Sequence, residues 1–399
     1  MSLTATDRGA AAIAAPGTKG RLVTDRPAVW FAGLLLVLLT LFIGAEVSIR
    51  MATLFVIGGG LGFALLHGAF GFTAGWRNLV TKGDGRGLRA QLLVIALAMI
   101  VFIPLINGYG PDPIVGAIAP VGTSLVMGSF LFGLGMQLGN GCGSGTLFTL
   151  GGGSARMLVT LVFFIIGSVI GSIHLPWWLA LPGYDPVNLA AYLSIPGVLI
   201  LQFALLGALA FWSLRHEIRR GFAAPAAGPG EFLRGPWPFF WAAIALAVLD
   251  IATLLIAGHP WTITYGFALW GAKGAEALGF DMSGFAFWQW AKGRTALENS
   301  VFADVTSVMN IGLILGAMAA AGLAGSFAKP LNLTPRFFAA AVLGGLLMGY
   351  GARLAFGCNI GALLGGIASG SLHGWIWFGF AFAGTIVGIR LRPVFGFRD

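Results

Sequence analysis

Charged residues are scarce in this chain. Only 9% of its 399 residues are charged, 57% are hydrophobic, and the mean hydropathy is +0.89. A soluble domain has about a quarter of its residues charged. The composition therefore excludes a soluble protein and indicates an all-α polytopic membrane protein. The net charge of +9 does not indicate nucleic-acid binding, because Lys and Arg lie in short segments between apolar runs, where they act as topology signals.

Cysteine is equally scarce. The chain has two, Cys142 and Cys358, with no CxxC pair and no Cys/His cluster. This pattern excludes a disulfide framework and a zinc site, and we predict no metal and no cofactor. The polar N-terminal stretch lacks a cleavable apolar region, so we predict no removable signal peptide.

The two cysteines lie in two copies of one segment. The first copy, residues 133–153, reads GLGMQLGNGCGSGTLFTLGGG, and the second, residues 349–369, reads GYGARLAFGCNIGALLGGIAS. At an offset of 216 (358 − 142) the cysteines and several glycines and leucines coincide. The match continues into two GxxxG-type segments, at 167–171 and 384–388. An internal repeat therefore organises the chain.

Ten apolar segments have about the 20 residues that a helix needs to cross a bilayer. They are residues 28–47, 51–72, 88–108, 121–139, 156–173, 188–214, 236–258, 302–325, 337–356 and 374–391. The segment 261–280 is less apolar and carries Lys273 and Glu276, so we predict a broken or re-entrant helix there.

These segments predict five regions. They are a cytoplasmic N-terminal tail (1–27), a first membrane repeat with a connecting helix (28–214), a cytoplasmic linker (215–235), a second repeat (236–391) and a C-terminal tail (392–399).

The placement of Lys and Arg predicts the orientation of the repeats. Positive charge places 77–89 and the linker in the cytoplasm, whereas 109–120 and 174–187 carry none and are expected outside. If 261–280 is re-entrant, Lys329, Arg336 and the C-terminus also lie inside, both termini are cytoplasmic, and the two repeats are inverted. Inverted repeats bring paired loops to the bilayer midplane from opposite sides. We therefore predict an hourglass with one cysteine from each side of its waist.

Both cysteine segments are rich in glycine, which predicts a break in the helix. A helix that restarts after such a break presents free N–H groups, and these bind anions. The candidate substrate-binding residues around the cysteines are Asn140, Gly141, Gly143, Gly145, Gly357, Asn359 and Gly361. The alternative is that the small residues only allow close helix packing. A cysteine in the middle of both breaks favours a binding site.

The thiols themselves suggest the chemistry of the anion. A thiol with a pKa of about 8.5 is mostly protonated at neutral pH. It is then a weak, soft S–H donor, which suits a sulfur acceptor better than an oxygen of sulfate or phosphate. We therefore expect a sulfur-containing anion.

The two signatures, NGCGSGTL and FGCNIGALLGG, resemble those of the YeeE/YedE sulfur-transport family, over about residues 30–392. The resemblance implies a transporter of the bacterial inner membrane that imports thiosulfate or a related inorganic sulfur anion. It implies that Cys142 and Cys358 hand the substrate across the waist by S–H···S contacts, alongside a small TusA-like sulfur carrier. A third cysteine expected in the first half is absent, since residues 71–73 read Gly-Phe-Thr. A selenium species is therefore an alternative substrate.

Other polar residues inside apolar segments are further candidates. Gln137 and Arg353 stand at equivalent positions five residues before their cysteines. Arg353 would neutralise an anion or reach to the membrane interface, and Lys273 would line the anion path. Asp250 would bind a coupling proton, or be a protonated or paired structural residue.

Two functions of other classes compete with transport. One is a membrane thiol oxidoreductase that uses Cys142 and Cys358 as a dithiol/disulfide pair, although such enzymes usually have a CxxC pair. The other is a structural membrane scaffold, which would not need paired cysteines. We predict a transporter and not an enzyme.

Overall fold

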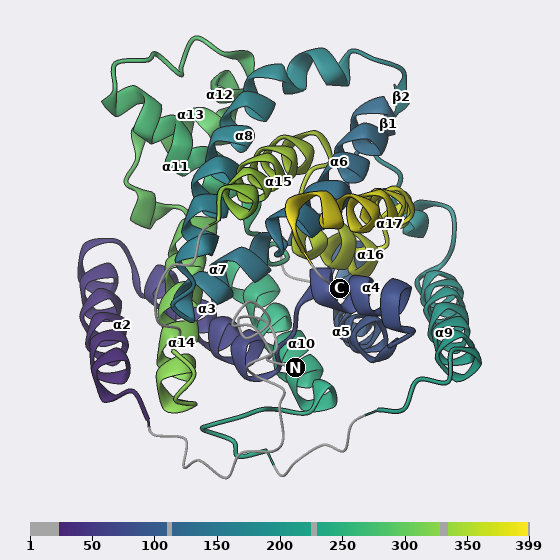
Figure 1. The fold of residues 1–399 in the computed structure, drawn as a ribbon. Helices are drawn as coiled ribbons and strands as arrows, with labels where there is room; N and C mark the ends of the chain where they lie inside the picture. The colour runs from purple at the N-terminus through teal and green to yellow at the C-terminus, as the bar shows by residue number, and fades with distance from the viewer. Residues whose placement is uncertain (1–23, 110–113, 225–229, 328–333, 398–399) are drawn as a thin grey trace.

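The computed structural model describes residues 24–109, 114–224, 230–327 and 334–397 (Figure 1). The described chain is helical apart from one short antiparallel pair, β1 (Val121–Gly122) with β2 (Gly183–Tyr184). The N-terminal tail up to residue 23, Lys329 and Arg398 lie outside the described residues.

The first half of the chain contains eight α-helices and two short helices. They are α2 (Arg26–Glu46), α3 (Ile49–His67), α4 (Phe72–Lys82), α5 (Arg86–Pro104), the π-helix η1 (Leu105–Tyr109), α6 (Thr123–Gly139), α7 (Gly143–Gly151), α8 (Ala155–Leu179), the 3₁₀ helix η2 (Leu189–Ala191) and α9 (Ile195–Arg219).

The second half begins after the linker. Its helices are α10 (Phe239–Ala257), α11 (Thr264–Ala277), α12 (Ala286–Gln289), α13 (Ala291–Glu298), the 3₁₀ helix η3 (Val301–Ala303), α14 (Val305–Leu323), α15 (Pro335–Leu354), the π-helix η4 (Asn359–Leu364), α16 (Gly365–Ala368), α17 (Leu372–Leu391) and the 3₁₀ helix η5 (Arg392–Phe395).

Nine helical segments of the described chain are long and apolar enough to cross a membrane. They correspond to nine of the ten predicted segments. The tenth, 121–139, forms α6, which has only 17 residues because the glycine-rich break ends it at Gly139. The prediction of ten full-length spans is therefore corrected to nine. In addition, α9 extends through Arg219, so the first basic residues assigned to the linker are helical.

The segment 261–280 does not form a full span. Its helix, α11, has 14 residues, about 21 Å at 1.5 Å per residue, which is too short for the hydrocarbon core. The chain before it is irregular, yet Trp261 and Ile263 are buried. This agrees with a broken helix.

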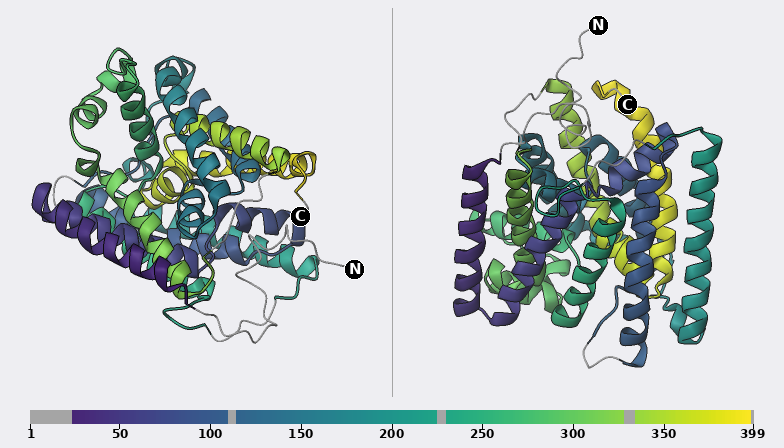
Figure 2. Two further views of the ribbon diagram at one scale, coloured as in Figure 1. Left: turned by 60° about the vertical axis from the view of Figure 1, so that its left-hand side comes forward. Right: turned by 90° about the horizontal axis from the view of Figure 1, so that it is seen from below.

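The ends of the helices define two faces of the bundle. Asp25 N donates to Gly322 O (2.8 Å), and Trp237 N donates to His67 O (2.8 Å). The start of α2 and the ends of α3 and α14 thus lie with the linker, and we call this the linker face. We call the opposite face the cavity face, because a cavity described below opens there. Figure 2 (right) shows the long helices between the two faces, with the start of α2 and the end of η5 at the same one.

The repeated helices pack in a matching way. α6 packs against α15 and α17, and α15 packs against α8 and α6. Gly133 of α6 lies against the carbonyl of Ala381, and its repeat equivalent Gly349 lies against that of Phe164; a Cβ at either glycine would overlap backbone. Phe164 and Ala381 are themselves related by the repeat offset of 217 (381 − 164). Close helix packing therefore explains these two glycines.

Candidate functional site

The first cysteine loop contains the predicted helix break. After α6 ends, Asn140 adopts a left-handed conformation with φ of 60°, and Cys142 becomes the N-cap of α7. The Cys142 thiol accepts a hydrogen bond from Gly145 N (3.4 Å), and its carbonyl accepts one from Thr146 N (2.8 Å). The chain thus restarts as a half-helix directly at the thiol.

The second cysteine loop follows the same backbone path. Phe356, the repeat equivalent of Asn140, also has φ of 60°. Cys358 is the N-cap of η4, and its thiol accepts a hydrogen bond from Ile360 N (3.5 Å). Its carbonyl accepts one from Ala362 N (2.9 Å), as Cys142 does from Thr146. Gly141 and Gly357 occupy the same place in the two turns, each packed against the backbone of the helix that follows.

The two loops meet inside the bundle. A Cβ on Gly143 would lie 3.1 Å from Cys358 Sγ and 3.5 Å from a methyl group of Ile263. Cys142 and Cys358 are free thiols with 1% and 0% exposure. The repeat therefore brings both thiols into one interior region, closed to solvent in this conformation.

Cys142 has several polar neighbours. Ser144 Oγ lies 3.4 Å from its Sγ, and the backbone amide of Phe72 is close enough to the thiol to influence it electrostatically. Phe72 begins α4, whose N-cap makes no side-chain hydrogen bond. The stretch without the expected third cysteine thus lies near the first cysteine loop. The family resemblance pointed to this stretch, but no local pattern in the sequence relates residue 72 to residue 142.

Two further polar atoms close to this loop have no hydrogen-bond partner among the described residues. They are Thr73 Oγ1 and Gln137 Oε1, and both are buried. Gln137 Nε2 donates to Thr73 O (3.3 Å), so these two side chains are neighbours. Buried polar atoms without partners are rare and require an explanation. A ligand or water bound beside these two atoms would supply the missing partner.

The Cys358 loop has a different polar environment. The Asn359 side chain is fully buried, and neither its nitrogen nor its oxygen has a described partner. Arg353 donates through Nη2 to Thr264 Oγ1 (3.1 Å), and its guanidinium lies 6.0 Å from the centre of the Tyr265 ring. Arg353 is only 8% exposed and its Nε lacks a described partner. It therefore stays inside the protein and does not reach to an interface.

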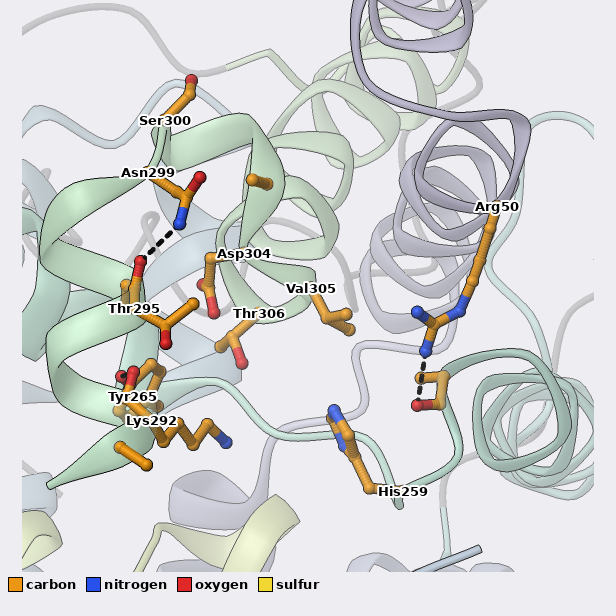
Figure 3. Close-up of a pocket in the computed structure, with 14 residues that line it drawn as sticks. Arg50, His259, Tyr265, Lys292, Thr295, Asn299, Ser300, Asp304, Val305 and Thr306 are labelled. Atoms are coloured by element: carbon orange, nitrogen blue, oxygen red, sulfur yellow. Dashed lines mark hydrogen bonds between the residues drawn. The ribbon is translucent and has the colours of Figure 1, made fainter. Parts of the chain in front are cut away.

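A cavity of about 680 Å³ opens on the cavity face (Figure 3). Its charged and titratable lining residues are Arg50, Tyr265, His259, Lys292 and Asp304. Figure 3 shows Arg50, His259 and Lys292 approaching it from three separate segments. None of these residues was among the predicted site residues.

The cavity reaches almost to the Cys358 loop. Thr306 lines the cavity, and its hydroxyl lies 3.0 Å from that of Thr262. A Cβ on Gly361 would lie 3.6 Å from the Thr262 methyl group. The Thr262–Thr306 pair therefore lies between the cavity and η4, the helix that Cys358 caps.

The cavity suits a small anion. Arg50 is held by the carbonyls of Ile256 and Ala257, each at 2.7 Å, and contributes a fixed cation. Burial lowers the pKa of His259 and raises the pKa of Asp304, despite the hydrogen bonds that Asp304 accepts from Ser307. The shift at Asp304 disfavours the negative charge of the only carboxylate among the described lining residues, so the cations Arg50 and Lys292 outweigh it there.

Two predicted site residues lie elsewhere. Lys273 donates to Leu297 O (2.8 Å) and does not line the cavity. The lysine that lines the cavity is Lys292. Asp250 is fully buried, and its Oδ1 accepts a hydrogen bond from Trp261 N (3.1 Å), while its Oδ2 has no described partner. Asp250 thus holds the irregular segment that carries Ile263 against Gly143. Its role in proton coupling stays a prediction.

The chain is similar in sequence to several known proteins. A family model described as "Sulphur transport" matches residues 67–387, which include both cysteine loops. The "Thiosulfate transporter TsuA" of Spirochaeta thermophila is 29% identical over 330 residues, which are 79% of this chain and 91% of that protein. The protein of the same name from Escherichia coli K12 is 26% identical over 343 residues, covering 83% and 91%. The "Probable transporter YedE" of Escherichia coli K12 is 30% identical over 162 residues, 39% of each chain.

Proposed function

The chain belongs to the sulphur transport (YeeE/YedE) family and is a multi-pass membrane protein, and from this we propose that it imports thiosulfate or a related inorganic sulfur anion. In this proposal Cys142 and Cys358 pass the anion across the waist of an hourglass, in a bacterial inner membrane.

The contact between the two cysteine loops carries the proposal. Gly143, at the start of the first half-helix, faces the Cys358 thiol, and each thiol lies against backbone N–H groups. Amides at helix N-termini stabilise an anion that has lost its water, because they place partial positive charge at the site. The protonated thiols add soft donors for a sulfur atom. An oxyanion without exposed sulfur would use the amides but not the thiols.

The orientation follows from charge. Most Lys and Arg of the connecting segments lie at the linker face, among them Arg86, Arg215, Arg219 and Arg234. The positive-inside rule then makes this face cytoplasmic, and both termini would lie there. The cavity would open outward, where its cations would concentrate the anion before it enters the waist.

Two observations support inverted repeats. α6 begins at the cavity face, where Thr123 N donates to Pro182 O (3.1 Å) at the end of the α8 segment. α15 begins at the linker face, where Gly396 packs close to Arg336. The two helices thus approach the waist from opposite faces, as inverted repeats require. Release would occur at the linker face, where a small TusA-like sulfur carrier would receive the sulfur.

Uptake of labelled thiosulfate tests the proposal. In a sulfur-auxotrophic host without its own thiosulfate uptake, we expect the parent protein to support growth and uptake on thiosulfate. Cys142→Ala and Cys358→Ala, inserted at parent level, should not. Failure of the parent protein to take up any sulfur or selenium anion offered would overturn the proposal. A Cys142–Cys358 disulfide that cycles with a quinone or thioredoxin would indicate the oxidoreductase instead.

A further inference from the structure

Three arginines from distant parts of the chain meet at the linker-face end of the Cys142 loop. Arg77 of α4 donates to Asn140 Oδ1 (2.9 Å), and Arg392 of η5 donates to the same oxygen (3.3 Å). Arg392 also donates to the carbonyl of Gln137 (2.7 Å) and is 4% exposed. Asn140 stands two residues before Cys142, so these guanidinium groups lie close to the first cysteine loop.

The third arginine, Arg156, is in the first turn of α8. Its guanidinium packs on the rings of Phe337 (5.1 Å) and Phe397 (4.7 Å), and it lies close enough to Arg392 and Arg77 to experience their charges. The rings cover the faces of the guanidinium, but its edge is unsatisfied: Nε and Nη2 are buried and have no hydrogen-bond partner among the described residues.

Two features of the position of Arg156 are unfavourable for the fold. A cation in the first turn of a helix opposes the helix dipole, which favours an anion there. Ser154, the N-cap of the 25-residue α8, makes no side-chain capping hydrogen bond. A buried charged donor without an acceptor is also costly. An anion at this point would satisfy the Arg156 edge and the start of α8 together.

We propose that Arg156, with Arg77 and Arg392, forms a second anion site, which takes the oxygen end of a small divalent oxyanion such as sulfate or thiosulfate. A planar guanidinium presents paired N–H donors that match two oxygens of such an anion. The thiols at the waist would contact the sulfur end of thiosulfate. The arginines, on the linker-face side, would contact its oxygen atoms. That this site serves release rests on the proposed function; that it binds an oxyanion does not.

Equilibrium binding of labelled sulfate to the full-length protein in lipid nanodiscs tests the site. The double variant Cys142→Ala/Cys358→Ala removes the waist thiols, and we expect it to keep saturable sulfate binding. Adding Arg156→Gln should weaken that binding at least tenfold. Arg156→Lys keeps the charge but loses the paired donors, so it should weaken binding less. The matched control is Arg219→Gln, an exposed arginine at the end of α9 on the same face, which should leave binding unchanged.

Parent-like sulfate binding by folded Arg156→Gln and Arg156→Lys proteins would overturn the proposal. So would an equal loss in Arg219→Gln, since that would indicate only diffuse surface charge. The release role is tested in vesicles of known orientation. Sulfate at the linker face should inhibit thiosulfate transport by the parent protein, and Arg156→Gln should lose this inhibition while inhibition from the cavity face persists. A protein that transports no sulfur anion but binds sulfate through Arg156 would refute the proposed function and leave the site standing.

Discussion

The two cysteine loops share a backbone but not their surroundings. Asn140 and Phe356 have the same φ, and both cysteines cap the helix that follows. Yet Cys142 has a hydroxyl neighbour, Ser144, whereas no side-chain hydrogen bond is described for the Cys358 thiol. The repeat thus sets where the thiols lie, and the residues around each loop make the surroundings of the two thiols different.

The guanidinium groups near the two loops also come from different parts of the chain. Arg353 precedes Cys358 on its own helix, α15. Its repeat equivalent is Gln137, whose carbonyl instead accepts a hydrogen bond from Arg392 of η5. A cation therefore lies near each loop, but one belongs to the repeat and the other to the end of the chain. The two loops thus combine matching backbones with different charged surroundings.

The largest effect is expected at Cys358. Cys358→Ala removes a donor with no described side-chain substitute, and an unmade hydrogen bond to a charged group costs about 1.5–3 kcal/mol, or about ten- to hundredfold in rate. Cys142→Ala should cost less, about tenfold, because Ser144 remains. Initial thiosulfate uptake by proteoliposomes measures both. A larger loss at Cys142 would mean that the first thiol matters more than the second. Parent-like rates in both variants would rule out the thiol relay.

The contact between the loops is tested by Gly143→Ala. The new methyl group would lie 3.1 Å from Cys358 Sγ, and overpacking of about 1–2 kcal/mol corresponds to roughly a five- to thirtyfold loss of uptake. Gly207→Ala is the matched control, because a Cβ there meets nothing within 4 Å. Equal uptake by the two variants would mean that the loops do not need to touch.

Ser144→Ala would make the first loop resemble the second. Loss of one hydrogen bond costs about 0.5–1 kcal/mol, so uptake alone should fall only about two- to fivefold. In the Ser144→Ala background, Cys142→Ala should then lose as much activity as Cys358→Ala. Strictly additive losses at residues 142 and 144, from the same uptake assay, would show that the hydroxyl does not substitute for the thiol.

The smallest effect is expected from pH, and only at the cavity face. Burial holds the pKa of His259 below its ordinary value of 6.5, so the ring is neutral at pH 7 and gains charge on acidification. Burial raises the pKa of Asp304, so its carboxylate loses charge in the same direction. Both changes make the cavity more positive as pH falls. Charges at such partly buried positions near a surface are worth up to about 1 kcal/mol, so uptake at low thiosulfate should rise about two- to threefold as the pH falls below neutral.

The double variant His259→Gln/Asp304→Asn is the control for this pH effect. It should flatten the profile of initial uptake, measured without a pH gradient. A rate that falls on acidification in the parent protein would contradict a positively charged cavity.

Much of the architecture was predictable because it depends on local sequence. Length and hydropathy of the apolar runs predicted nine of the spans, and glycine content predicted both helix breaks. The repeat offset placed Cys142 and Cys358 at equivalent positions, and the paired signatures indicated the family. The prediction failed for α6, where the glycine break shortens the helix below a full span, and for the end of α9, which continues through Arg219.

The sequence by itself determined that this is a membrane protein with two matched thiol loops, since hydropathy, glycine and a repeat are patterns along one chain. Only the tertiary structure decided what surrounds those loops. Phe72 at Cys142, the cavity cations Arg50, His259 and Lys292, and the cluster of Arg77, Arg156 and Arg392 each join segments far apart in sequence. Such neighbours are set by how helices pack against one another, and a periodic pattern within one helix carries no information about which distant helix it will meet.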